Sequence, residues 1–100
     1  MIDSTDCFRL PTECRTLENG LRVILHADDL LPLTSVHVCY HVGSKNEDPN
    51  LTGLAHLFEH LMFEGSQRHD DDYFKPLQEA GASVNGTTGH DLTNYFEVVP

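Results

Sequence analysis

The chain has 100 residues, of which 39% are hydrophobic and 22% charged, as in an ordinary globular domain. Its net charge is −10, and the six Lys and Arg residues are scattered, which excludes the basic stripe of a nucleic-acid-binding protein. The acidity could attract basic peptides, although a solvated acidic surface is the simpler interpretation. No apolar run approaches the roughly 20 residues that a membrane-spanning helix needs, so we expect no membrane span.

The N-terminal sequence MIDSTDCFRL has neither a basic start nor an apolar segment, so it predicts no signal peptide. We therefore expect a cytoplasmic protein by default, or a periplasmic or secreted one if a signal was removed. Cys7, Cys14 and Cys39 form an odd set without a CxxC pair, which favours reduced thiols over a disulfide framework. A buried structural role is expected for Cys39.

The first half of the chain predicts strands. Residues 1–12 form a lead-in segment, and residues 14–26 predict a β-hairpin with a two-residue turn at Asn19-Gly20. Residues 33–43 alternate as a strand with one apolar face (Val36, Val38, Tyr40 and Val42). The polar stretch 43–52 predicts a loop, and Thr52 or a residue nearby is a suitable helix N-cap.

The second half predicts two helices and two strands. The hydrophobic period indicates a helix over about 53–63 and another from residue 70 or 72 to Ala80, which Pro76 bends or delays and Gly81 terminates. Asp70 to Asp72 suit a helix N-terminus better than a calcium site. Two strands follow, joined around residues 89–91. This order predicts an α+β fold with a largely antiparallel sheet and helices packed on one face.

The first helix carries the sequence AHLFEH, in which His56 and His60 are four residues apart and Glu59 lies between them. Side chains at positions i and i+4 are neighbours on a helix, so two imidazoles can bind one zinc ion while the carboxylate activates water. The apolar side chains form the opposite face, which we expect to pack on the sheet. The alternative is a set of polar residues on the solvated side of a helix.

Other chemical groups have simpler interpretations. His37, Cys39 and His41 alternate along one strand face and are spaced too widely for easy chelation, so a half-buried sheet face is favoured over a soft-metal site. A local hydrogen bond is favoured over catalysis for His90 and Asp91. Tyr95 and Phe96 are expected to pack in the core or against the first helix.

Several stretches together resemble the pitrilysin-type (M16) zinc metallopeptidases. They are NGLRVILH, VHVCYHVGSKNEDPNLTGLAHLFEHLMFEGS and LQEAGASVNGTTGHDLTNYFEVVP, which contain the inverted zinc motif H-x-x-E-H in order and at the expected spacing. The match looks closest to bacterial processing-peptidase-like members. It implies that residues 13–100 are a partial N-terminal domain of this family.

The resemblance implies roles for individual residues. His56 and His60 would bind Zn²⁺, Glu59 would be the catalytic base, and the third zinc ligand of the family would lie beyond residue 100. Asn85, Gly86 and Thr87 match a family segment that binds an extended peptide as an added strand. Gly86 replaces the common alanine there, and a plain turn or bulge is the alternative for Asn85-Gly86.

The implied function is zinc-dependent peptide hydrolysis by a metalloendopeptidase, of which this chain is a truncated N-terminal portion with little activity by itself. The partners would be an extended peptide or protein substrate, with a second copy or a partner M16 subunit as a further possibility. The alternative is a non-catalytic module that keeps the fold and self-associates through its sheet edges.

Overall fold

The computed structural model describes residues 10–69 and 73–100. The chain divides into two compact units, Met1–Leu31 and Pro32–Pro100. In the first unit, strands β1 (Glu13–Thr16) and β2 (Arg22–Leu25) pair antiparallel. The hairpin is confirmed, and its turn differs from the prediction. The amide of Leu17 donates to the carbonyl of Leu21, so three residues form the loop, and Gly20 closes it with a φ of +85°.

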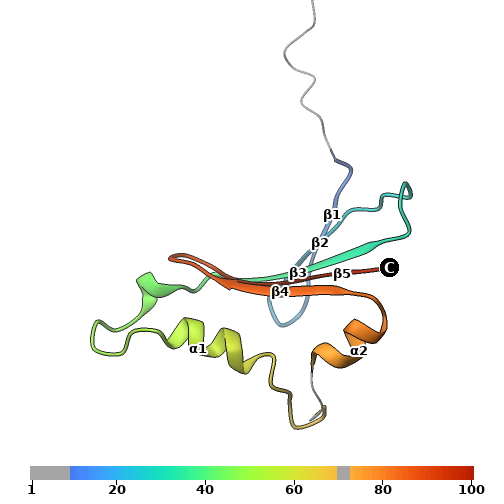
Figure 1. Ribbon diagram of the computed structural model, residues 1–100. Coiled ribbons are helices and arrows are strands. Elements are labelled where there is room, and N and C mark those ends of the chain that lie inside the picture. The colour runs from blue at the N-terminus through green and yellow to red at the C-terminus, as the bar shows by residue number, and fades with distance from the viewer. Residues whose placement is uncertain (1–9, 70–72) are drawn as a thin grey trace, which may run out of the picture. The chain divides into compact units, whose positions relative to one another are not determined.

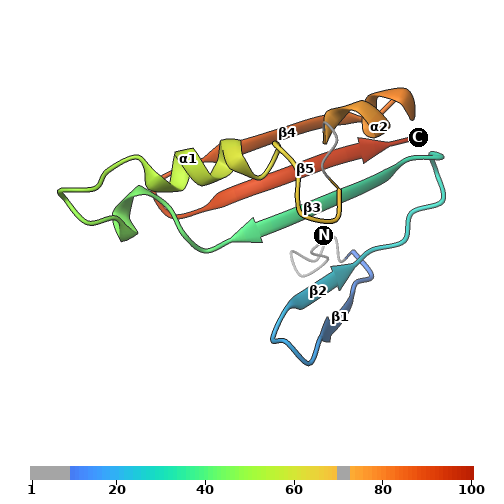
Figure 2. The same ribbon diagram turned by 90° about the horizontal axis from the view of Figure 1, so that it is seen from below.

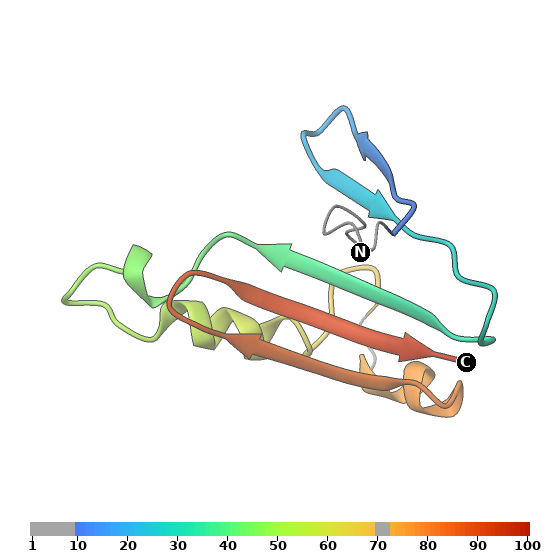
Figure 3. The same cartoon turned by 90° about the horizontal axis from the view of Figure 1, so that it is seen from above.

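The second unit is built on a three-stranded antiparallel sheet in the order β3-β5-β4 (Figure 3). Its strands are β3 (Thr34–Tyr40), β4 (Ser83–Thr88) and β5 (Thr93–Val99). The register pairs Gly86 with Tyr95 and Thr88 with Thr93. Both members of such a pair lie on the same face of the sheet. Asn85-Gly86 therefore lies within a regular strand, and the turn or bulge alternative is wrong.

Two helices cover one face of this sheet (Figures 1 and 2). Helix α1 (Leu54–Leu61) lies over β4 and β5, and α2 (Phe74–Glu79) lies over β4. A short 3₁₀ helix, η1 (Ser44–Asn46), interrupts the loop before α1. The predicted α+β class with helices on one face of an antiparallel sheet is confirmed. None of the helices in the described part of the chain is long and apolar enough to cross a membrane.

Helix α2 begins at Phe74, later than the predicted start at residue 70 or 72, so Pro76 delays the helix. Pro76 is its third residue, where a missing backbone N–H removes no intrahelical hydrogen bond. Gly81, with a φ of +79°, ends the helix as predicted. The amides of Gly81 and Ala82 donate to the carbonyls of Gln78 and Leu77, which is a Schellman cap. The predicted aspartate cluster at residues 70–72 lies outside the described residues.

Burial departs from the sequence expectations. Ala55 (7% exposed) and Thr93 (3% exposed) are buried, and the Thr93 hydroxyl donates to the carbonyl of Val42 at 3.0 Å. The apolar side chains of α1 remain about half exposed, Leu57 at 51% and Leu61 at 48%. The apolar face was expected to pack on the sheet. Instead Ala55 is the one residue of α1 that is buried.

Tyr95, Phe96 and Cys39 lie on different faces of the three-stranded sheet. Tyr95 lies on the helix-covered face, with its ring 5.6 Å from that of Phe63. Phe96 lies on the other face, 5.9 Å from the ring of His37, and so does not pack against α1. Cys39 is an exposed free thiol, so its predicted burial is wrong; the same face of the described sheet carries no helix.

Candidate metal centre

The site is built on α1 from residues one helical turn apart. The Nε2 atoms of His56 and His60 lie 3.1 Å apart, and the ring centroids are separated by 4.7 Å. Both imidazoles are exposed, so both are accessible to a solvent ion. The predicted convergence of the two rings is present in the structure.

The spacing of these nitrogens suits zinc. Tetrahedral zinc with zinc–nitrogen bonds of about 2.0–2.1 Å places two ligand nitrogens about 3.3 Å apart. The observed 3.1 Å separation is close to this value. Among residues 10–69 and 73–100, no group of three or more His, Cys, Asp or Glu side chains is arranged to hold a metal ion. The described residues therefore fit two ligands of a zinc site.

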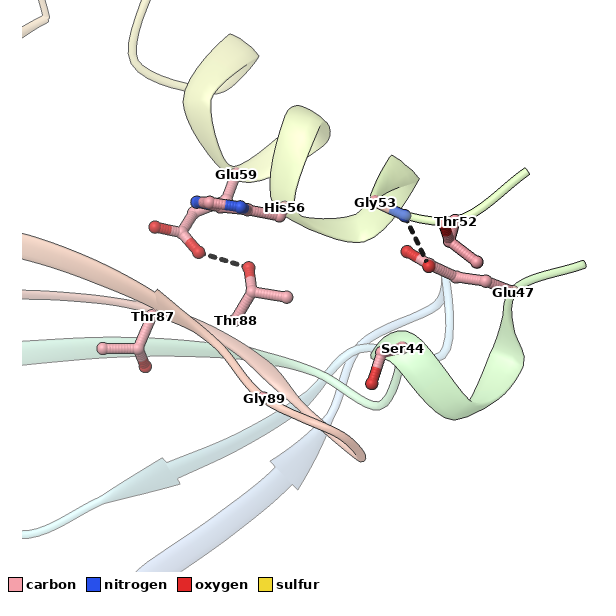
Figure 4. A pocket seen from close by; sticks show the side chains of 9 residues that line it. All are labelled: Ser44, Glu47, Thr52, Gly53, His56, Glu59, Thr87, Thr88 and Gly89. Carbon is pink, nitrogen blue, oxygen red and sulfur yellow. Dashed lines mark hydrogen bonds between the residues drawn. The ribbon is translucent and has the colours of Figure 1, made fainter. Parts of the chain in front are cut away.

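Glu59 lies beside the imidazoles and is half-buried. Its carboxylate accepts a hydrogen bond from the hydroxyl of Thr88, at the end of β4 (Figure 4). The charge of Glu59 also contributes, after burial, to the raised pKa of the Tyr95 hydroxyl. The carboxylate is thus held between the helix and the sheet, on the side of the helix where His56 projects. Thr88 was not among the residues singled out from the sequence.

A pocket of about 590 Å³ opens between the start of α1 and the end of β4 (Figure 4). His56 and Glu59 line it from the helix, Thr87 and Thr88 from the strand, and Glu47 from the preceding loop. The loop after β4 closes one side of this pocket. An extended ligand along β4 would therefore pass the carboxylate of Glu59.

The predicted substrate-binding residues lie on an edge strand. In the described part of the chain, β4 pairs with β5 alone, so its other side is open. Asn85 is exposed on the face away from the helices, and its side-chain oxygen accepts the amide of Gly86 at 2.8 Å. Gly86 lies under the ring of Phe63 on the helix-covered face. The strand brings its residues 87 and 88 to the pocket and leaves Asn85 outside it.

Two groups given simpler interpretations have specific contacts. The imidazole Nδ1 of His90 lies 2.9 Å from the hydroxyl of Ser44, and Asp91 forms an ion pair with Lys45. These contacts join distant loops, so the expected local hydrogen bond at residues 90–91 is wrong. His37, Cys39 and His41 are all exposed, so the half-buried sheet face expected for them is wrong. His37 Nε2 lies 3.5 Å from Cys39 Sγ.

Comparison with known proteins places this arrangement in a family. The family model described as "Insulinase (Peptidase family M16)" matches residues 22–100. The chain belongs to peptidase family M16. The family predicted from the motifs is therefore confirmed, while the nearer likeness to processing-peptidase-like members stays a prediction, as does the division into residues 1–12 and 13–100.

Named relatives agree with this assignment. The human insulin-degrading enzyme is 34% identical over 82 residues, which cover 80% of this chain and 8% of that protein. The zinc protease PqqE of Helicobacter pylori is 35% identical over 86 residues, covering 84% of this chain and 19% of the relative. The chain therefore spans less than a fifth of either relative.

Solved structures show the same fold. The crystal structure of a protease from Helicobacter pylori superposes with a TM-score of 0.84 at 33% identity, covering 91% of this chain and 22% of that one. The crystal structure of pitrilysin gives a TM-score of 0.82 at 26% identity, with coverage of 89% and 10%. Both matches are to part of a much longer protein.

Proposed function

We propose that this chain is the zinc-binding part of a metalloendopeptidase that cleaves extended peptides. The single observation that carries the proposal is the 3.1 Å approach of the His56 and His60 nitrogens beside the carboxylate of Glu59. Membership of family M16, with a relative named as a zinc protease, supports zinc as the metal. His56 and His60 would hold the zinc, and a further ligand would come from outside the described residues.

The chemistry assigned to Glu59 follows from its place in the pocket. Zinc held by His56 and His60 would supply Lewis-acid chemistry, lowering the pKa of a water molecule towards roughly 7. The Glu59 carboxylate takes a proton from the attacking water and returns it to the amine leaving group. The hydrogen bond from Thr88 holds this carboxylate in one orientation. The substrate would lie along the open side of β4, joined to its backbone as an added strand.

Residues 85–87 keep their proposed role as substrate contacts, in a modified form. Backbone groups on the open side of β4 would bind the peptide. The side-chain oxygen of Asn85 accepts the hydrogen bond of the Gly86 amide. It would therefore compete with a peptide for this backbone donor and regulate peptide binding at the strand edge. Thr87 lines the pocket while its side chain faces away from the helices, so it would contact the substrate through its backbone.

Two substitutions test the proposal. Zinc titration of the chain by calorimetry should show weak binding that is lost in His60→Ala and retained in Glu59→Gln. In the whole protein, Glu59→Gln should abolish cleavage of a fluorogenic peptide while zinc content stays at the wild-type level. Zinc binding that survives the loss of both histidines would contradict the assignment, as would rapid cleavage by Glu59→Gln.

A second candidate is a non-catalytic module that self-associates. It is favoured by the exposed apolar side chains of α1 and by strands β3 and β4, each of which has one open side in the described sheet. Light scattering coupled to size-exclusion chromatography tests it. A stable monomer over a wide concentration range would count against self-association without affecting the zinc proposal.

A further inference from the structure

The start of α1 has no cap of its own. Its N-cap is Gly53, with a φ of +91°, and no side chain at that position bonds the helix amides. The N-cap, predicted at Thr52 or nearby, is the neighbouring Gly53, and it does not cap the helix through a side chain. A helix of eight residues with one buried side chain is marginal by itself, because nucleation is costly and little packing compensates.

Glu47 supplies the missing cap from outside the helix. One of its carboxylate oxygens accepts the amide of Gly53 at 2.7 Å, and the other accepts the amide of Ala55 at 2.8 Å (the first of these is drawn in Figure 4). These donors lie six and eight residues along the chain. The negative charge also faces the positive end of the helix dipole. A two-oxygen contact fixes the orientation of the first helical turn as well as its position.

Glu47 follows η1 directly, and η1 is held by the loop after β4. The amides of Ser44 and Lys45 donate to the carbonyls of Gly89 and His90, at 3.2 and 3.1 Å. The contacts of Ser44 with His90 and of Lys45 with Asp91 add two side-chain links. Glu47 therefore transmits the position of the loop after β4 to the helix that carries the histidines.

Resting on the zinc-binding function proposed above, we propose that Glu47 is a positioning residue for the metal centre. The carboxylate fixes the first turn of α1 through Gly53 and Ala55, directly before His56. The two imidazoles converge on one ion only while this turn is formed, so metal binding and helix formation are linked. By reciprocity, a group that stabilises the turn raises the affinity of the histidine pair for zinc.

Helix α1 has a second attachment, the hydrogen bond from Thr88 to Glu59, so loss of the Glu47 contacts affects mainly the N-terminal turn. Thr88 holds Glu59 one turn further along the helix, so His60 lies next to a residue already fixed to the sheet. His56 lies between Gly53 and this anchor, and it follows Ala55 directly. Loss of the Glu47 contacts would free the turn before His56 while leaving the Glu59 end in place.

Zinc titration of Glu47→Ala tests the proposal, with Asp48→Ala as the matched control. Both substitutions remove one negative charge from adjacent positions, but the Asp48 carboxylate accepts the amide of Asn50 within its own loop and does not contact the helix. Removing an N-cap typically weakens a linked equilibrium by about three- to tenfold. We expect that loss of zinc affinity in Glu47→Ala, a smaller one in Glu47→Gln, and none in Asp48→Ala.

Amide hydrogen exchange on the metal-free chain gives a readout independent of zinc. In Glu47→Ala the amides of α1 should exchange faster while those of β5 keep their wild-type protection. Equal zinc affinity in Glu47→Ala and the wild type would overturn the inference, as would equal acceleration throughout the sheet. If the wild type fails to bind zinc, the proposed function fails, and unchanged protection of α1 in Glu47→Ala would then overturn this inference separately.

Discussion

Replacing Gly43 by alanine should separate the two loops that border the candidate site. A Cβ atom there would lie 2.5 Å from the carbonyl oxygen of His90 and 2.6 Å from that of Gly89. The φ of Gly43 is −163°, which any residue adopts, so the whole cost is steric. The loop at residues 89–90 would have to retreat by about 1 Å to reach ordinary contact.

That retreat breaks the two backbone hydrogen bonds between the loops, which are already 3.1 and 3.2 Å long. Each contributes about 1 kcal/mol, and overpacking costs about 1–3 kcal/mol. We therefore expect Gly43→Ala to lower the free energy of unfolding by about 3–5 kcal/mol.

Urea denaturation followed by far-UV circular dichroism measures this change, and Gly89→Ala is the matched control. A Cβ at Gly89 would lie 3.6 Å from its nearest neighbour, the carbonyl oxygen of Leu92, which is an ordinary contact. The two glycines face each other across the same loop contact and differ in the space available. Equal stability of Gly43→Ala and Gly89→Ala would refute the steric reasoning.

Three further outcomes are expected. Gly86→Ala should lower the free energy of unfolding by about 1 kcal/mol, because the new Cβ would lie 3.0 Å from the ring of Phe63; urea denaturation would show this, and the double variant with Phe63→Leu should recover the loss. The pKa of the Glu47 carboxyl is lowered from 4.5 by hydrogen bonds from helix amides, so its contribution is present above pH 4.5 and lost as the pH falls through the lowered pKa. Amide exchange of α1 should therefore accelerate in acid, with no such component in Glu47→Gln. Burial and nearby carboxylates raise the pKa values of Tyr73 and Tyr95 above 10.0, so stability should fall as the pH rises past 10.0, and less steeply in Tyr95→Phe when measured by urea denaturation.

Local patterns predicted most of the fold. Alternation identified the strand at residues 33–43, glycine and asparagine identified the first hairpin, and the helical period identified α1. The same period placed His56 and His60 on one side of that helix, and the observed approach of their nitrogens follows from it. These features depend on residues within one or two turns of each other, which is why a single sequence contains them.

Contacts between distant segments were not predictable in the same way. The cap of α1 was predicted at Thr52 or nearby, because capping residues normally precede the first turn directly. Glu47 reaches the helix only because η1 turns the chain back on itself and the loop after β4 holds it there. The signal available in the sequence was an acidic side chain shortly before an uncapped helix, and Asp48 carries the same signal.

The alternation of β4 assigns its residues to the site more sharply than the family segment did. Side chains of a strand point to opposite faces in turn, so Gly86 and Thr88 face the helices while Asn85 and Thr87 face away. Counting by two from the aromatic contact of Gly86 reaches Thr88, whose hydroxyl bonds the carboxylate of Glu59. A peptide added along this edge would bind through backbone N–H and C=O groups, which are the same for every residue of the strand. Under the proposed function, the side chain between such a peptide and the Glu59 carboxylate would therefore be that of Thr88, while Asn85 would act only at the edge.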